Sequence, residues 1–281
     1  MDNPRHIDLH NHSTASDGAL SPAALVRQAF DAGLSAMAIT DHDCLDGIDE
    51  ALAEGAKLGI EVVPGVELST KRPDGGSLHV LGYWIRQDHD EFNQTLATIR
   101  EGRHDRNTRI FKKLAELGAP IEASRVADLA GGDVVGRPHI AQALVEAGHV
   151  KSKQEAFDRY LAHGKPAYQS RRRLDPKEAI ALLHAAGGLA VLAHPAIHDI
   201  PKEELKAEIQ SMVEAGLDGI EVHYPHHNQA TQTWLLNLAA EFNLAVTGGS
   251  DFHGDFKANQ PMGHPFVPAA LLEKLKARRK D

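Results

Sequence analysis

HIDLHNH, residues 6–12, combines the pattern of a short strand with two histidines spaced two residues apart. Apolar residues at positions 7 and 9 alternate with polar ones, which predicts a strand over residues 6–10. A period of two directs Asp8, His10 and His12 to the same side. Two histidines in this arrangement can bind one metal ion, but a His-x-His pair can equally lie on an edge strand without any function.

Short apolar strands and amphipathic helices alternate on either side of a long central segment. In the N-terminal part, Ser21 and Pro22 predict the start of a helix that Gly33 ends. The other elements predicted there are strands 36–40, 60–63 and 77–85, helix 47–58 and a turn at 74–76. After the central segment, the predicted order is helix 176–186, strand 189–193, helix 202–215, strand 219–222, helix 228–241, strand 244–247 and a charged terminal helix 271–281. This alternation predicts an α/β fold around a largely parallel sheet.

The central segment has a different character. From about residue 91 to residue 161, helical periodicity dominates and no strand pattern appears. We therefore predict a barrel formed by residues 1–95 and 171–281, with an all-helical inserted subdomain at residues 96–170. We expect the insertion to select the substrate.

The composition restricts the chemistry to nitrogen and oxygen ligands. The chain has 18 histidines and one cysteine, Cys44, which excludes an internal disulfide and a cysteine-rich zinc site. The net charge of −9 argues against a surface for long duplex nucleic acid but is compatible with a small anion held by metal ions. Because no apolar run reaches the length of a membrane span and no signal-peptide pattern is present, we expect a cytoplasmic protein without a membrane partner.

Side chains that bind metals recur where the predicted strands end. These segments are Thr40-Asp41-His42-Asp43, Glu67, Ala193-His194-Pro195 and Gly249-Ser250-Asp251-Phe252-His253, and His79 lies on another strand. The carboxyl ends of the strands of a β/α barrel form one face, where active sites are built. We therefore expect these side chains to meet. Asp17, in a Ser/Thr-rich loop, can be a further ligand or a simple turn residue.

In their order and spacing these motifs resemble those of the PHP (polymerase and histidinol phosphatase) domain family. The resemblance covers roughly residues 5–90 and 173–265 and no motif position is lost. It implies a distorted seven-stranded β/α barrel. It also implies a metal-ligand role for the matching residues, which are His10, His12, Asp17, His42, Glu67, His79, His194, Asp251 and His253.

Nine ligands are too many for one ion, so we expect two or three divalent cations. Imidazole and carboxylate ligands without thiolate suit Mn²⁺, Zn²⁺ or Fe²⁺, and we expect Mn²⁺ first. Ions of this kind lower the pKa of bound water and clamp phosphoryl oxygens. Glu67 is the expected bridging ligand.

The free-standing barrel with a helical insertion resembles PHP phosphoesterases that act on nucleotides. We predict a phosphatase that removes the 3′-phosphate of a nucleoside 3′,5′-bisphosphate, such as adenosine 3′,5′-bisphosphate, and leaves the 5′-monophosphate AMP. Asp17 and His223 are candidates for the proton donor, although His223 can equally make a structural hydrogen bond. The candidate substrate-binding residues are Arg137, His139, Lys165 and Tyr168, since Arg137 can donate two hydrogen bonds to a phosphate near a helix start. Arg103 and Asn107 are expected at the surface.

Several other functions compete with this prediction. Within the phosphoesterases, they are a 5′–3′ exonuclease on short RNA and a histidinol-phosphate phosphatase. Amidohydrolases that cleave C–N bonds also begin with His-x-His, but commonly bridge their metals with a modified lysine, where this chain has Glu67. A non-catalytic structural PHP module fits poorly with an intact ligand set.

Overall fold

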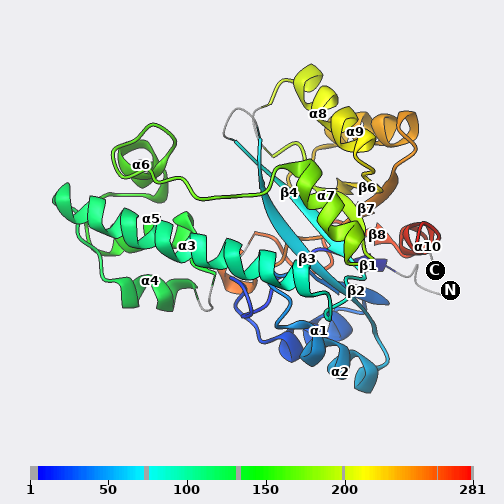
Figure 1. The fold of residues 1–281 in the computed structure, drawn as a ribbon. Coiled ribbons are helices and arrows are strands. Elements are labelled where there is room, and N and C mark those ends of the chain that lie inside the picture. The colour runs from blue at the N-terminus through cyan, green and yellow to red at the C-terminus, as the bar shows by residue number, and fades with distance from the viewer. Residues whose placement is uncertain (1–5, 73–75, 131–133, 198–199, 258, 280–281) are drawn as a thin grey trace. The chain divides into compact units, whose positions relative to one another are not determined.

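The computed structural model describes residues 6–72, 76–130, 134–197, 200–257 and 259–279 (Figure 1). The predicted turn at 74–76 and the last residues of the predicted terminal helix lie partly outside these ranges. The chain divides into two compact units, the first made of residues 1–93 and 173–281 and the second of residues 94–172. Among the described residues, no helix combines the length and apolar character needed to cross a membrane.

One sheet of eight strands organises the first unit. Its order is β7-β6-β5-β4-β3-β2-β1-β8. The strands are β1 (His6–Asp8), β2 (Ala36–Ile39), β3 (Glu61–Lys71), β4 (Ser77–Tyr83), β5 (Leu189–Ala193), β6 (Gly219–His223), β7 (Ala245–Gly248) and β8 (Val267–Pro268). The neighbours in β1-β2-β3 and in β5-β6-β7 are parallel, whereas β4 is antiparallel to both β3 and β5.

The sheet nearly closes on itself between β1 and β7. The Leu9 N–H donates to the Gly248 carbonyl at 3.1 Å, and Asn11 forms a parallel bridge with Phe252. This confirms the predicted α/β barrel with its seven strands. The addition is β8, a short strand that pairs antiparallel with β1.

Helices cover the barrel, and their ends follow the predicted capping signals. They are α1 (Pro22–Asp31), α2 (Ile48–Leu58), α7 (Pro176–Ala185), α8 (Lys202–Glu214), α9 (Gln229–Glu241), α10 (Ala270–Lys276) and the 3₁₀ turn η2 (Gly254–Lys257). The Ser21 hydroxyl accepts from the Ala24 N–H, and Asp175 forms a capping box with Glu178. The core inside is apolar, with Ile7, Val63, Leu81 and Val191 buried in one cluster.

The second unit is helical and has its own core. After the start of α3 (Asp90–Glu116) it holds α4 (Ala123–Ala130), α5 (Arg137–Glu146), α6 (Lys153–Ala156) and the π-helical turn η1 (Phe157–Leu161). Ile110, Val126, Ile140 and Leu161 are buried together in this unit. None of its described residues is in a strand.

Candidate metal centre

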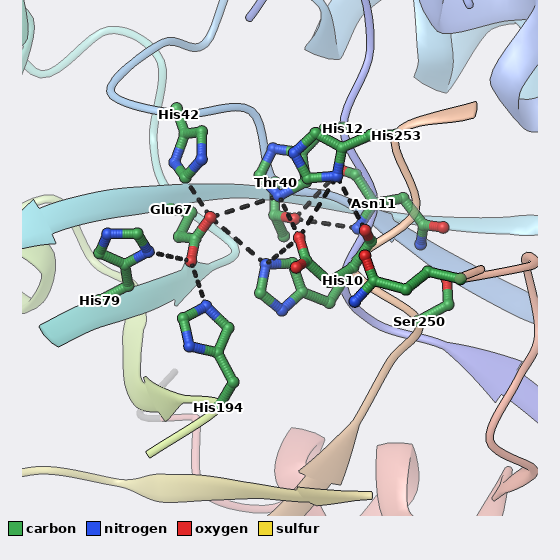
Figure 2. A network of polar contacts seen from close by, with 12 residues as sticks. His10, Asn11, His12, Thr40, His42, Glu67, His79, His194, Ser250 and His253 are labelled. Atoms are coloured by element: carbon green, nitrogen blue, oxygen red, sulfur yellow. Dashed lines mark hydrogen bonds and ion pairs between the residues drawn. The ribbon is translucent and has the colours of Figure 1, made fainter. Parts of the chain in front are cut away.

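All nine predicted ligands come together at one edge of the sheet. Figure 2 labels all of them except Asp17 and Asp251, whose contacts are given below. His10 and His12 follow β1, His42 follows β2, His194 follows β5, and Asp251 and His253 follow β7, with Asp17 in the loop before α1. The carboxyl ends of parallel strands meet at this edge. His79 lies near the start of β4, and reaches the same edge because β4 is antiparallel.

Glu67 has a different position from the one expected. The predicted strand ended at residue 63, whereas β3 continues to Lys71 and holds Glu67 in its interior. The extension is paired with β4 from Gly65↔Tyr83 to Lys71↔Ser77. A strand interior fixes the Glu67 side chain more firmly than a loop would.

The two carboxylate oxygens of Glu67 contact different histidines. Oε1 lies 2.7 Å from His79 Nδ1 and 3.0 Å from His194 Nε2. Three nitrogens surround Oε2, namely His42 Nδ1 at 3.0 Å, His12 Nε2 at 3.3 Å and His10 Nε2 at 3.4 Å. The carboxylate is 1 % exposed, so it is buried between these two sets of rings. Such an arrangement fits a carboxylate that bridges two ions.

Asp251 and Asp17 complete the cluster. Asp251 Oδ1 lies 3.3 Å from His12 Nε2 and 3.4 Å from His253 Nδ1. Asp17 Oδ1 lies 3.3 Å from His253 Nε2, and its Oδ2 lies 3.8 Å from His42 Nε2. His253 therefore connects the two aspartates.

The donor atoms of the cluster are arranged as ligands of divalent cations, and several of them have no hydrogen-bond partner among the described residues. Three sets each have ligand atoms within 4.8 Å of one another, namely His10/His12/Glu67/Asp251, His12/Asp17/His42/His253 and His42/Glu67/His79. Several atoms of the cluster are buried without a hydrogen-bond partner, namely His10 Nε2, both nitrogens of His12, His42 Nδ1, Glu67 Oε2 and His253 Nε2. Unpaired buried polar atoms are costly and need an explanation, which cations bound among them supply.

The carboxylates of the cluster are held in the ionised form. Burial by itself would raise the pKa of Glu67, but the charges of His42, His79 and His10 outweigh it and hold this pKa well below its usual range. Burial likewise opposes ionisation of Asp17, yet His42 and His253 bring its pKa well below the usual value. Ionised carboxylates are the form that binds a cation.

Comparison with known proteins identifies the family. The model of the PHP domain matches residues 8–168, which is more than half of the chain. The chain belongs to the PHP domain family.

A 3′,5′-nucleoside bisphosphate phosphatase of Chromobacterium violaceum is 33% identical over 97% of both chains. A 5′-3′ exoribonuclease of Haemophilus influenzae is 37% identical over 89% of this chain and 90% of its own length. A crystal structure from Bifidobacterium adolescentis, assigned as a metal-dependent phosphoesterase, superposes with a TM-score of 0.85 at 30% identity over 99% of both chains.

Within this PHP barrel, Asp8 has a supporting position outside the cluster. β1 ends at Asp8, so the strand alternation does not extend to His10 and His12. The Asp8 carboxylate accepts hydrogen bonds from the Ser250 hydroxyl at 2.5 Å, the Ser250 N–H at 3.0 Å and the Gly263 N–H at 2.8 Å. Asp8 thus fixes the loop that carries Asp251 and His253.

Glu221 is a buried carboxylate that the sequence prediction missed. Its Oε1 lies 3.1 Å from His10 Nδ1, and its Oε2 accepts from the His194 N–H at 2.8 Å. A carboxylate that accepts from one ring nitrogen leaves the other nitrogen free for a metal. The available signal was a glutamate in the middle of the apolar strand GIEVH.

Two of the candidate ligands have strained backbones. His194 has φ 27° and Asp251 has φ 51°, a region that non-glycine residues seldom adopt. His194 is held by its N–H bond to Glu221, and Asp251 Oδ2 accepts from the Tyr224 hydroxyl at 2.9 Å and from Lys257 Nζ at 2.8 Å. Such strain persists where the surroundings over-determine the conformation, as they do at functional sites.

His223, the other predicted proton donor, is in none of the three ligand sets, which also leave out His194. A β-bulge shifts the register between Glu221 and His223, which breaks the alternation that would place both side chains on one face. Burial lowers the pKa of His223, and a hydrogen bond with Gln232 on α9 opposes this. The Gln232 contact is a hydrogen bond of the kind that the structural alternative requires, and the proton-donor role of His223 stays a prediction.

The predicted substrate-binding residues belong to the helical unit. The Arg137 guanidinium carbon lies 4.6 Å from the centre of the Tyr168 ring, and Arg137 donates to the Gln169 carbonyl at 2.9 Å. His139 Nδ1 accepts from the Gly136 N–H at 3.1 Å, and the Lys165 N–H donates to the Ala162 carbonyl. The prediction that Arg103 and Asn107 lie at the surface is wrong, since they are only 8 % and 5 % exposed.

Proposed function

We propose that this chain is a metal-dependent phosphatase that removes the 3′-phosphate of nucleoside 3′,5′-bisphosphates, with AMP as the product from the adenosine compound. The observation that carries the proposal is the clustering of nine imidazole and carboxylate side chains, of which buried Glu67 is one. The match to a bisphosphate phosphatase over 97% of both chains supports the choice of substrate.

The nine side chains are proposed to form three cation sites that share only Glu67. This grouping differs from the three overlapping geometric sets because it includes His194, whose Nε2 lies 3.0 Å from Glu67 Oε1. One set is His10, His12, Glu67 and Asp251, a second is Glu67 with His79 and His194, and the third is Asp17, His42 and His253. Two or three divalent ions would fit, Mn²⁺ being our first choice and Zn²⁺ or Fe²⁺ the alternatives. When bound, such ions polarise the phosphoryl group and lower the pKa of water.

The roles of the chain's own groups follow from their contacts. Glu67 and Asp251 hold negative charge among the histidine rings, and Glu221 keeps His10 oriented. Asp17 was also a candidate for the proton donor. We propose it as a ligand, because His253 faces its Oδ1 and His42 faces its Oδ2.

Arg137, His139, Lys165 and Tyr168 are proposed as phosphate-binding residues of the helical unit. In support, Arg137 Nε is buried without a hydrogen-bond partner among the described residues, while its guanidinium stacks on Tyr168. A guanidinium with a free N–H and a fixed plane is suited to a phosphate.

A 5′–3′ exoribonuclease acting on short RNA is the second candidate function. It is favoured by the relative of that name, which is 37% identical over 89% of this chain. Both activities need the same cluster of ligands, but they give different products.

The deciding experiment measures products from Mn²⁺-loaded protein with adenosine 3′,5′-bisphosphate, 3′-AMP, 5′-AMP, short RNA and histidinol phosphate. We expect chelator-sensitive phosphate release that is selective for the bisphosphate. Release of mononucleotides from RNA as the dominant reaction would replace the phosphatase by the exoribonuclease. Absence of any product from the panel would reject both proposals.

A further inference from the structure

A cavity of about 380 Å³ lies beside the metal centre, inside the barrel unit. Its size falls within the usual range of small-molecule sites. Its lining residues are Tyr224, His226, Phe256, Lys257, Asn259 and Gln260. A larger cavity of about 600 Å³ at the start of α7 contains no predicted ligand, and Arg72 in its wall is paired with Glu208.

Two walls of the smaller cavity touch a candidate metal ligand directly. The Tyr224 hydroxyl and Lys257 Nζ both donate to Asp251 Oδ2, at 2.9 Å and 2.8 Å. Asp251 Oδ1, on the other side of the carboxylate, faces His12 at 3.3 Å. The Tyr224 ring also lies 5.2 Å from the ring of His194. A molecule in the cavity would therefore be separated from the candidate metal ligands only by the side chains of Tyr224 and Lys257.

The lining combines a cation with exposed aromatic surface. The Lys257 side chain is 39 % exposed, and an ammonium group that gives one hydrogen to Asp251 keeps two for a ligand. Phe256 is 46 % exposed, so part of its ring is accessible beside these polar groups. His226 makes an edge contact with Tyr224 at 5.7 Å, and Gln260 donates to the Tyr224 hydroxyl at 3.2 Å.

We infer that this cavity binds the nucleoside part of the substrate and presents its phosphate to the metal centre. Phe256 offers a face on which a base can stack, and aromatic stacking tolerates any base. The ammonium of Lys257 contacts an anionic oxygen of the substrate phosphate. The amides of Asn259 and Gln260 supply polar contacts to the sugar or base. This inference rests on the proposed function, because it assigns the substrate of the same centre.

The test of the stacking role is Phe256→Ala, with Phe30→Ala as the matched control. Phe30 is 45 % exposed on α1 and is absent from the cavity lining. For adenosine 3′,5′-bisphosphate we expect Phe256→Ala to raise KM on the order of tenfold, the loss typical of one base stack. For the base-free methyl riboside 3,5-bisphosphate we expect no change in KM. An equal effect on both substrates, or none on either, would overturn the inference.

The role of Lys257 is tested by Lys257→Gln against Lys276→Gln. Lys276 also pairs with carboxylates at 2.8 Å, but those are Glu61 and Glu273 at the surface. We expect Lys257→Gln to lower kcat/KM for both bisphosphates while the bound metal, measured by mass spectrometry, stays unchanged. Unchanged kinetics would remove Lys257 from the subsite, and loss of metal would make it a positioning residue for Asp251.

Calorimetric binding of 5′-AMP separates this inference from the proposed function. If the wild-type protein hydrolyses no phosphate ester, the proposed function fails, and weaker AMP binding by Phe256→Ala than by Phe30→Ala still supports the cavity. If the wild type hydrolyses the bisphosphate but the two variants bind AMP equally, the nucleoside subsite is rejected.

Discussion

Glu67 is central to the candidate ligands, since histidine nitrogens approach both of its oxygens. Its place in β3 shows which features local sequence patterns predict and which they do not. The ligand type at this position was predicted correctly, but the strand was predicted to end before it. The extension of β3 depends on its pairing with β4, a contact that no local pattern displays.

Glu67→Gln is expected to lower the activity strongly and to reduce the bound metal. An amide has no charge and only one oxygen, so it cannot bridge two cations. Since metal ions contribute several kcal/mol to the transition state, the rate should fall by about 100-fold or more. Metal content is measured by mass spectrometry and the rate by phosphate release. Glu61→Gln, at the exposed start of the same strand, should behave as the wild type.

Glu221→Gln tests the support of His10. The amide oxygen must accept from the His194 N–H, because a backbone donor cannot reverse its role. The NH₂ group then faces His10 Nδ1, which favours the tautomer with its proton on Nε2, towards the cluster. Removing such a supporting carboxylate typically costs about 10- to 100-fold in metal affinity. A metal titration that shows wild-type affinity would contradict this role.

At the scale of elements, the connection after β7 packs directly against the end of β1. A Cβ atom at Gly249 would lie 2.5 Å from both the N and the Cβ of His10. Only a residue without a side chain allows this approach. The glycine therefore sets the position of the first histidine of the cluster.

Gly249→Ala is expected to destabilise the protein by about 1–3 kcal/mol, as overpacking generally does, and to weaken metal binding. The control is Gly102→Ala inside α3, where a Cβ meets no atom within 4 Å. That change should stabilise by up to about 1 kcal/mol, because alanine favours a helix. Urea unfolding measures both. Equal stability of the two variants would show that the barrel adapts to the added methyl group.

Elements were predicted best where their signals are local. The starts of α1 and α7 follow from side-chain caps, and β5 begins and ends where its apolar run does. Elements that depend on distant partners were predicted less well. The long β3 and the added β8 owe their hydrogen bonds to β4 and β1.

At the scale of the whole molecule, the cluster ties together segments that are distant in the chain. His10 and Glu221 are 211 residues apart in sequence, and Asp8 and Ser250 are 242 apart. Cations bound among these segments would hold the ends of the barrel sheet together. Metal binding and folding of the barrel should therefore be coupled.

Addition of Mn²⁺ at about 100 times its Kd should stabilise the folded protein by about 2.7 kcal/mol. For a chain of this size the expected rise in Tm is roughly 5–10 °C. Scanning calorimetry with Mn²⁺ and with a chelator measures the difference. The Glu67→Gln protein should show a smaller shift, and an equal shift would mean that the ions bind elsewhere.

By itself, the sequence determined the α/β alternation, the metal-binding residue types and the edge at which they meet. These properties follow from local patterns. The apolar pattern of a strand shows which residues lie at its end, and the carboxyl ends of parallel strands lie at the same edge of the sheet. Only the tertiary structure showed which of the nine candidate ligands approach one another, how Glu221 and Lys257 contact them, and where the bulge at His223 breaks the strand alternation. Those features depend on register, on a bulge and on contacts across more than 200 residues. Such contacts form only when the barrel closes, so no local pattern encodes them.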